Sequence, residues 1–187
     1  EKLSGKGDTS QKLTLMKTSA DSLKKSADAL NDSSLLEKKK IKKKDEKTGE
    51  EIEVEDYDWD KITKAVKSFV EDYNDVVKEA GESNTKDVLR NASWMTGMTD
   101  KNSNMLAKIG ITIGKGNKLE LDEDALKQAD ISSLKTVFTG YNSFVSKISQ
   151  KATGISNAAN RASATYTNNG TYSKTDSSLT SSKIDKE

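Results

Sequence analysis

Residues 131–166 read ISSLKTVFTGYNSFVSKISQKATGISNAANRASATY, and this stretch decides the fold. Its apolar side chains recur at alternating steps of three and four residues, the heptad pattern of a helix that packs along one stripe. We therefore expect one continuous helix over 131–166, about 50 Å long at a rise of ~1.5 Å per residue. The apolar seam consists of Ile131, Leu134, Phe138, Tyr141, Val145, Ile148, Ala152, Ile155, Ala159, Ala162 and Tyr166.

The seam of this helix changes along its length, from large side chains in its first half to alanine towards its end. Small side chains let a neighbouring helix approach closely. We predict that the first half belongs to the core of this domain, and that the second half makes assembly contacts with a second copy or another partner. The residues assigned to these contacts are Ala152, Ile155, Ala159, Ala162 and Tyr166.

Two upstream stretches show the same alternation and are expected to pack as helices beside the last one. The first covers about 13–36 and the second about 59–80, with Asp58 or Asp56 as N-cap and Gly81 as the stop. Val70 and Val77 widen the second seam, which predicts contacts with more than one neighbour. The seam positions are Leu13, Met16, Ala20, Leu23, Ala27 and Leu30, then Trp59, Ile62, Val66, Phe69, Tyr73, Val76 and Ala80.

A third helical stretch and a hairpin lie between these helices and the last one. The helical stretch, about 85–108, is interrupted by Gly97 and the polar run 99–104, so we expect a kink or two shorter helices. Residues 109–121 alternate apolar and polar side chains around a glycine-rich turn, which predicts a β-hairpin, and Asp122 is a candidate N-cap for a following helix. The apolar hairpin positions are Ile111, Ile113, Leu119 and Leu121.

Charge segregates sharply in residues 37–56. A basic arm, KKKIKKK at 38–44, is followed by an acidic arm, EEIEVED at 50–56, with turn residues Thr48-Gly49 between them. This predicts a hairpin stabilised by cross-strand Lys–Glu pairs. A lysine run can also bind nucleic acid, but the acidic arm cancels its field, so we favour a solvated strand and expect no nucleic-acid partner.

The fold class that follows is mainly α: an elongated antiparallel helical bundle or coiled coil with two short β-hairpins. We expect a flexible N-terminus at 1–12 and a helical stalk domain at 13–166 that carries the hairpins at 37–56 and 109–121. The Ser/Thr/Asn/Lys-rich residues 167–187 are expected to be a disordered tail.

Composition argues against catalysis. The 187 residues contain no His and no Cys, which removes the commonest general base, the thiolate nucleophile and the commonest metal ligands. Gly114 and Gly116 lack the spacing of a phosphate loop, and Trp59 and Trp94 are expected to be core or interface anchors. The net charge is +1 and no stretch has the apolar length of a membrane span. We assign no catalytic, cofactor-binding or metal-binding residue and expect a non-enzymatic protein without a membrane partner.

A set of short motifs appears in a fixed order across 59–166. This order resembles the C-terminal half of the flagellar hook-associated protein 2 family, the filament cap proteins. The Ile-Gly-Ile and Leu-x-Leu-Asp pair is the most specific part of the resemblance. The motifs are Phe69-Val70, Tyr73-Asn74, Leu106, Ile109-Gly110-Ile111, Gly116, Leu119-Glu120-Leu121-Asp122, Val137-Phe138 and Gly140.

The resemblance implies an exported, extracellular flagellar protein that promotes flagellin polymerisation at the distal tip of the filament. Its implied partners are further copies of the chain in a ring, flagellin, the hook–filament junction proteins and an export chaperone, with no cofactor. Family members usually carry large β-rich domains where this chain has only residues 37–56, which indicates a miniature or truncated member. The alternative is a secreted helical adhesin unrelated to flagella, with the charged hairpin as its binding surface.

Overall fold

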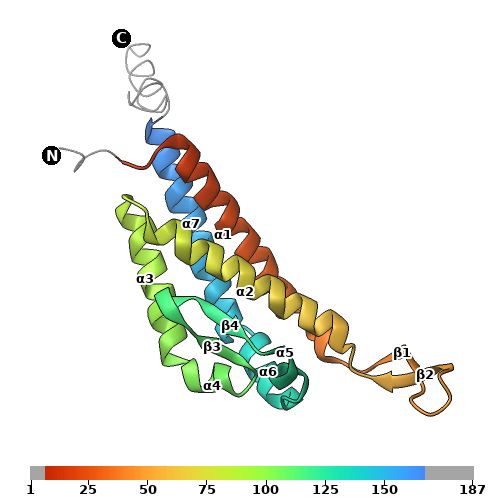
Figure 1. The fold of residues 1–187 in the computed structure, drawn as a ribbon. Helices are drawn as coiled ribbons and strands as arrows, with labels where there is room; N and C mark the ends of the chain where they lie inside the picture. The colour runs from red at the N-terminus through yellow and green to blue at the C-terminus, as the bar shows by residue number, and fades with distance from the viewer. Residues whose placement is uncertain (1–6, 167–187) are drawn as a thin grey trace, which may run out of the picture.

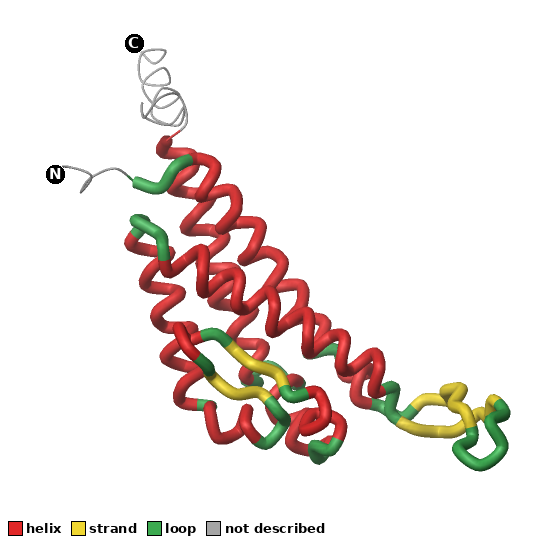
Figure 2. Tube along the Cα trace, viewed as in Figure 1, coloured by secondary structure: helices red, strands yellow, loops and turns green. Residues whose placement is uncertain are grey.

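Four long helices lie side by side in the computed structural model, which describes residues 7–166 (Figure 1). They are α1 (Ser10–Leu30), α2 (Trp59–Gly81), α3 (Lys86–Lys101) and α7 (Phe144–Tyr166). Helix α1 packs on α7 and α2, and α3 packs on α7 and α2. The described part of the chain is therefore mainly α, with the two short hairpins that the sequence predicts, and helices dominate the trace (Figure 2). None of its helices is both long and apolar enough to cross a bilayer.

The seams predicted for the first two helices are confirmed, with different ends for the first. Helix α1 begins at Ser10, inside the segment 1–12 that we expected to be flexible, because the Thr9 hydroxyl caps it. It stops at Leu30, and a 3₁₀ turn, η1 (Ser33–Leu36), follows. Helix α2 begins where predicted, with the Asp58 carboxylate accepting a bond from the Lys61 N–H. All predicted seam residues of the two helices are buried except Trp59, which is half-buried.

The predicted interruption of the third helical stretch is present at Asn102. Helix α3 ends at Lys101 and the short helix α4 (Ser103–Ala107) follows, while Gly97 stays inside α3. The Asn102 side-chain amide donates to the Met98 carbonyl at 2.8 Å, which satisfies a carbonyl at the end of α3.

The prediction of one continuous helix over 131–166 is wrong. The stretch forms α6 (Ile131–Phe138) and α7, separated by a turn in which Gly140 has φ +101°. The Asn31 carboxamide oxygen accepts a bond from the Gly140 N–H at 2.9 Å, and Ser143 caps α7 by accepting from the Ser146 N–H. Tyr141 consequently lies in the turn and is 83% exposed instead of on the seam.

Both hairpins are antiparallel and pair as predicted. Strands β1 (Lys39–Lys44) and β2 (Glu51–Asp56) form a projecting hairpin at the far end of the bundle from the start of α1 and the end of α7 (Figure 1). Strands β3 (Ile111–Ile113) and β4 (Leu119–Leu121), joined by the turn η2 (Lys115–Asn117), lie against α2. Helix α5 (Glu123–Lys127) then begins with Asp122 as its N-cap, as predicted.

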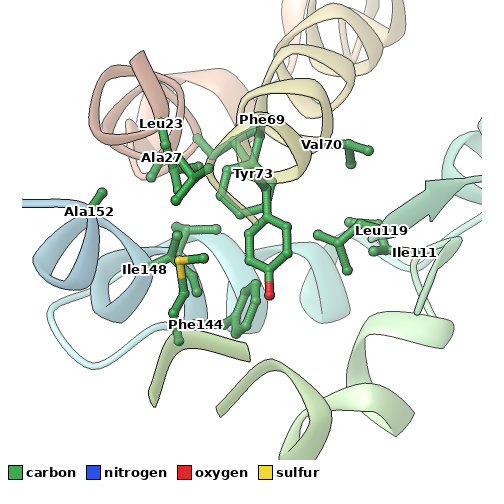
Figure 3. Packing of buried hydrophobic residues seen from close by; sticks show 14 of the residues in the cluster. Leu23, Ala27, Phe69, Val70, Tyr73, Ile111, Leu119, Phe144, Ile148 and Ala152 are labelled. Atoms are coloured by element: carbon green, nitrogen blue, oxygen red, sulfur yellow. The ribbon is translucent and has the colours of Figure 1, made fainter. Parts of the chain in front are cut away.

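One apolar cluster joins all these elements except the projecting hairpin and the turn η2. Phe69 and Tyr73 of α2 lie at its centre, with Phe144 of α7 packed edge-on to Phe69 at a ring separation of 6.3 Å (Figure 3). The Tyr73 hydroxyl donates to Thr99 Oγ1 of α3 at 2.8 Å. Burial raises the pKa of Tyr73 to about 12, so its phenol stays neutral and anchors α3 to α2.

Candidate assembly site

The glycine motif 109–111 fixes the position of the second hairpin. Gly110 has φ +86°, and a Cβ built there would lie 2.7 Å from the Asp122 carbonyl oxygen and 2.9 Å from the Leu126 nitrogen. The close approach lets the Asp122 N–H donate to the Gly110 carbonyl at 2.8 Å. The two halves of the Ile-Gly-Ile and Leu-x-Leu-Asp pair are therefore in direct backbone contact, which explains why they occur together.

Asn74 attaches the same hairpin to α2. Its side-chain amide donates to the Leu119 carbonyl at 2.9 Å, and its carboxamide oxygen accepts from the Leu119 N–H at 2.7 Å. Asn74 thus pairs with β4 as a neighbouring strand would, and it covers the outer edge of that strand. The motif residues Tyr73 and Asn74 link α2 to α3 and to β4, respectively, so the motifs build one rigid platform.

A buried carboxylate fixes the first described residues to the α2–α3 turn. Asp8 is 3% exposed and accepts bonds from Thr85 Oγ1 at 2.6 Å, Ser83 Oγ at 2.7 Å and the Asn84 N–H at 2.8 Å. Burial alone would raise its pKa, but these bonds and the nearby Lys12 charge together hold the pKa below its ordinary value. Asp8 therefore connects the start of α1 to the turn between α2 and α3. This turn lies at the end of the bundle where α7 ends (Figure 1).

The residues predicted to make assembly contacts lie on α7, and the structure places most of them under α1. Ala152, Ile155 and Ala159 are at most 1% exposed, and Ala162 is half-buried. The side chain of Tyr166 lies outside the described residues. Helix α7 packs on α1 within one chain, so contact of these residues with a partner stays a prediction.

Two serines strengthen the packing of α7 on α1. Ser149 Oγ donates to Asp28 at 2.7 Å and Ser156 Oγ donates to Asp21 at 2.6 Å. The two helices run antiparallel. The two serines are seven residues apart on α7 and the two aspartates are seven residues apart on α1, a spacing of about two helical turns. For each of the two aspartates, burial favours the neutral form, but hydrogen bonds and lysine charges outweigh it and lower the pKa.

Two apolar side chains of α3 are exposed: Trp94, which the sequence predicts as a core or interface anchor, and Leu89, which sequence reasoning did not single out. Trp94 is 49% exposed and Leu89 is 39% exposed. Lys151 of α7 lies 4.0 Å from the centre of the Trp94 ring, a cation–π distance. Both apolar residues lie one position off the buried seam of Val88 and Met95, and this offset is the signal that would have identified them.

Most residues of the projecting hairpin are exposed to solvent. Lys43 forms a 2.5 Å ion pair with Asp56, and this hydrogen bond, with one from the Tyr57 N–H, lowers the pKa of Asp56. Tyr57 packs edge-on against Trp59 at 6.1 Å and lies under the Lys38 ammonium group. These ring contacts attach the base of the hairpin to the start of α2.

Several charged side chains of the described residues hold structural elements together. Residues 7–166 contain no group of three or more His, Cys, Asp or Glu side chains that could hold a metal ion. The carboxylates with a shifted pKa, apart from the helix caps, serve as hydrogen-bond acceptors between elements or within the hairpin. Their positions fit structural roles.

Comparison with known families gives one match. The family model described as flagellar hook-associated protein 2 C-terminus matches residues 83–187, which is more than half of the chain. The match includes Gly110, Asp122 and the whole of α7. Searches of curated proteins and of solved structures give no match.

Proposed function

This chain belongs to the flagellar hook-associated protein 2 family, and we propose that it acts as a filament cap that promotes flagellin polymerisation at the distal tip. The family consists of structural proteins of the bacterial flagellum. The proposed role includes export through the flagellar secretion system and an extracellular location. Its partners would be further copies in a ring, flagellin, the hook–filament junction proteins and an export chaperone.

The family match over 83–187 carries the proposal, because it coincides with residues that have a clear structural purpose. Gly110 permits the backbone contact with Asp122, and α3 and α7 form half of the bundle. A rigid helical stalk with a projecting hairpin at one end suits a protein that works through contacts between subunits. The proposed mechanism is non-covalent and uses packed helix surfaces.

The end of α7 remains our candidate for contacts with a partner. Ala162 is half-buried, whereas Ala152, Ile155 and Ala159 would become available only if α1 moved away from α7. We expect the partner to contact α1 and α7 together at this end.

Deletion of the gene in the source bacterium tests the proposal. The deletion should shorten or abolish filaments and release flagellin monomers into the medium, and the wild-type gene should restore growth. A strain with normal filaments after the deletion would contradict the proposal.

A secreted adhesin is the second candidate, favoured by the projection of the β1–β2 hairpin away from the bundle (Figure 1). Deletion of residues 39–56 would then abolish attachment to a surface while filament growth continues. An unchanged attachment after this deletion would remove the candidate.

A further inference from the structure

We propose that the β1–β2 hairpin joins neighbouring copies of this chain edge to edge, with the basic β1 of one copy paired to the acidic β2 of the next. The inference rests on the proposed function, since it requires self-assembly, and adds the surface through which copies recognise one another. We call the outer side of β1 the basic edge and the outer side of β2 the acidic edge.

Both edges are free within the described part of the chain. The sheet contains only β1 and β2, so each strand uses one side and leaves the other unpaired. The hairpin projects beyond the helices (Figures 1 and 2), and its main contacts are those between its own two strands. Unpaired strand edges present rows of N–H and C=O groups that can template a further strand.

The distribution of charge selects the partner strand. Every residue of β1 except Ile41 is a lysine, and every residue of β2 except Ile52 and Val54 is an acid. Two basic edges repel each other, and so do two acidic edges, whereas a basic edge attracts an acidic one. Charge therefore excludes a two-fold contact between identical edges and favours a head-to-tail contact, which closes into a ring when the rotation between copies permits.

The internal register of the hairpin can repeat between copies. Within the chain Lys40 is opposite Glu55, Lys42 is opposite Glu53, and Lys44 is opposite Glu51. A neighbouring β2 added antiparallel to the basic edge can meet the same partners in the same order.

The lysine side chains of β1 that lie opposite these glutamates are available for pairing with a second copy. Lys40, Lys42 and Lys44 form no ion pair with the described residues. Their ammonium groups can therefore bind the carboxylates of a second copy.

The opposite face of the hairpin supports the same arrangement. Ile41 pairs with Val54, and the adjacent Ile52 is 39% exposed. Addition of strands would extend this short apolar stripe across neighbouring copies. A two-stranded ribbon alone has little stability in water, and further strands stabilise it.

Thiol trapping tests the contact in the full-length protein, which has no cysteine of its own. One preparation carries Ile41→Cys and the other carries Val54→Cys, and the two are mixed under mild oxidation. We expect a mixed disulfide dimer to form several-fold faster than in a control mixture of Ile41→Cys with Lys108→Cys, an exposed position at the end of α4 and outside the hairpin. Equal rates in the two mixtures would overturn the proposal.

A charge-swapped variant tests the role of charge. Its three exchanges on each strand keep opposite charges within the hairpin, so the hairpin itself is expected to fold. The variant should trap with itself as fast as wild type does, and trapping between swapped and wild-type chains should fall to the control rate. An equal rate of disulfide formation with and without the charge swap, in all mixtures, would overturn the proposal. The substitutions are Lys40→Glu, Lys42→Glu, Lys44→Glu, Glu51→Lys, Glu53→Lys and Glu55→Lys.

Different results would overturn the edge contact and the proposed cap function. Trapping that ignores charge overturns the edge contact and leaves the proposed function intact. Normal filaments in the deletion strain overturn the proposed function, whatever trapping shows. Trapping of Ile41→Cys with itself as fast as with Val54→Cys would indicate a two-fold contact and also overturn the head-to-tail proposal.

Discussion

Replacement of Gly110 by alanine should destabilise the domain far more than the same change at Gly116. Both glycines have positive φ, +86° and +69°, so both substitutions force an L-residue into the left-handed region. The surroundings differ: a Cβ at Gly110 meets the backbone of Asp122 and Leu126, whereas a Cβ at Gly116 meets nothing within 4 Å. Gly116→Ala is therefore a matched control that isolates the effect of close packing.

The magnitudes follow from these two contributions. The left-handed conformation costs a residue with a Cβ about 1–2 kcal/mol, and alanine recovers about 0.4–1 kcal/mol by restricting the unfolded chain. Gly116→Ala should thus lose roughly 0–1.5 kcal/mol. Gly110→Ala should lose about 1–3 kcal/mol more, because the rigid backbone of Asp122 and Leu126 must shift.

Urea unfolding followed by far-ultraviolet circular dichroism measures both losses as changes in the transition midpoint at constant m value. The Gly110→Ala midpoint should lie clearly below that of Gly116→Ala. Losses within about 0.5 kcal/mol of each other, the spread of neutral surface substitutions, would refute the packing argument.

Three further outcomes are expected. Asn74→Ala should cost about 1–3 kcal/mol, because it leaves the backbone groups of Leu119 without partners; unchanged hydrogen exchange at the Leu119 amide would contradict this. Ionised Asp8 should stabilise the fold at pH values above its ordinary pKa of 3.8, and this contribution should be lost as the pH falls through its lowered pKa. Asp8→Asn should flatten this part of the pH profile of the unfolding free energy. An unaltered profile would contradict a stabilising role of the hydrogen bonds to Asp8. Tyr73→Phe should cost about 1 kcal/mol through loss of the bond to Thr99. Absorbance titration of the wild type should show one tyrosine that stays neutral until about pH 12, and the absence of this late step from the wild-type curve would contradict the burial of Tyr73.

Much of the fold could be predicted from the sequence because many helix caps and turns depend on one or two nearby residues. Asp58 and Asp122 each precede a helix and cap it through their own carboxylates. The basic arm and the acidic arm on either side of Thr48-Gly49 predicted β1 and β2, because both the turn and the cross-strand pairs are local. These features depend on neighbours a few residues away in the chain.

The break between α6 and α7 could not be predicted from the seam. A count of apolar steps remains regular through Tyr141, although the backbone leaves the helix after Phe138 and turns at Gly140. The turn is completed by Asn31, which is 109 residues away in sequence. Contacts at that separation leave no local periodic signal.

The candidate contact residues show a related difficulty. Alanines on a seam permit close approach by any helix, so their spacing does not identify the partner. In this chain α1 covers Ala152 and Ala159. The exposed Trp94, one position off the buried seam, shows that an offset from periodicity identifies surface residues better than the seam itself.

Immunogold labelling of this chain on isolated flagella tests the central claim most directly. The account predicts gold at the distal tip of each filament and its absence from filaments of the deletion strain. Label distributed along the filament shaft, or tips that remain unlabelled on intact wild-type flagella, would contradict it.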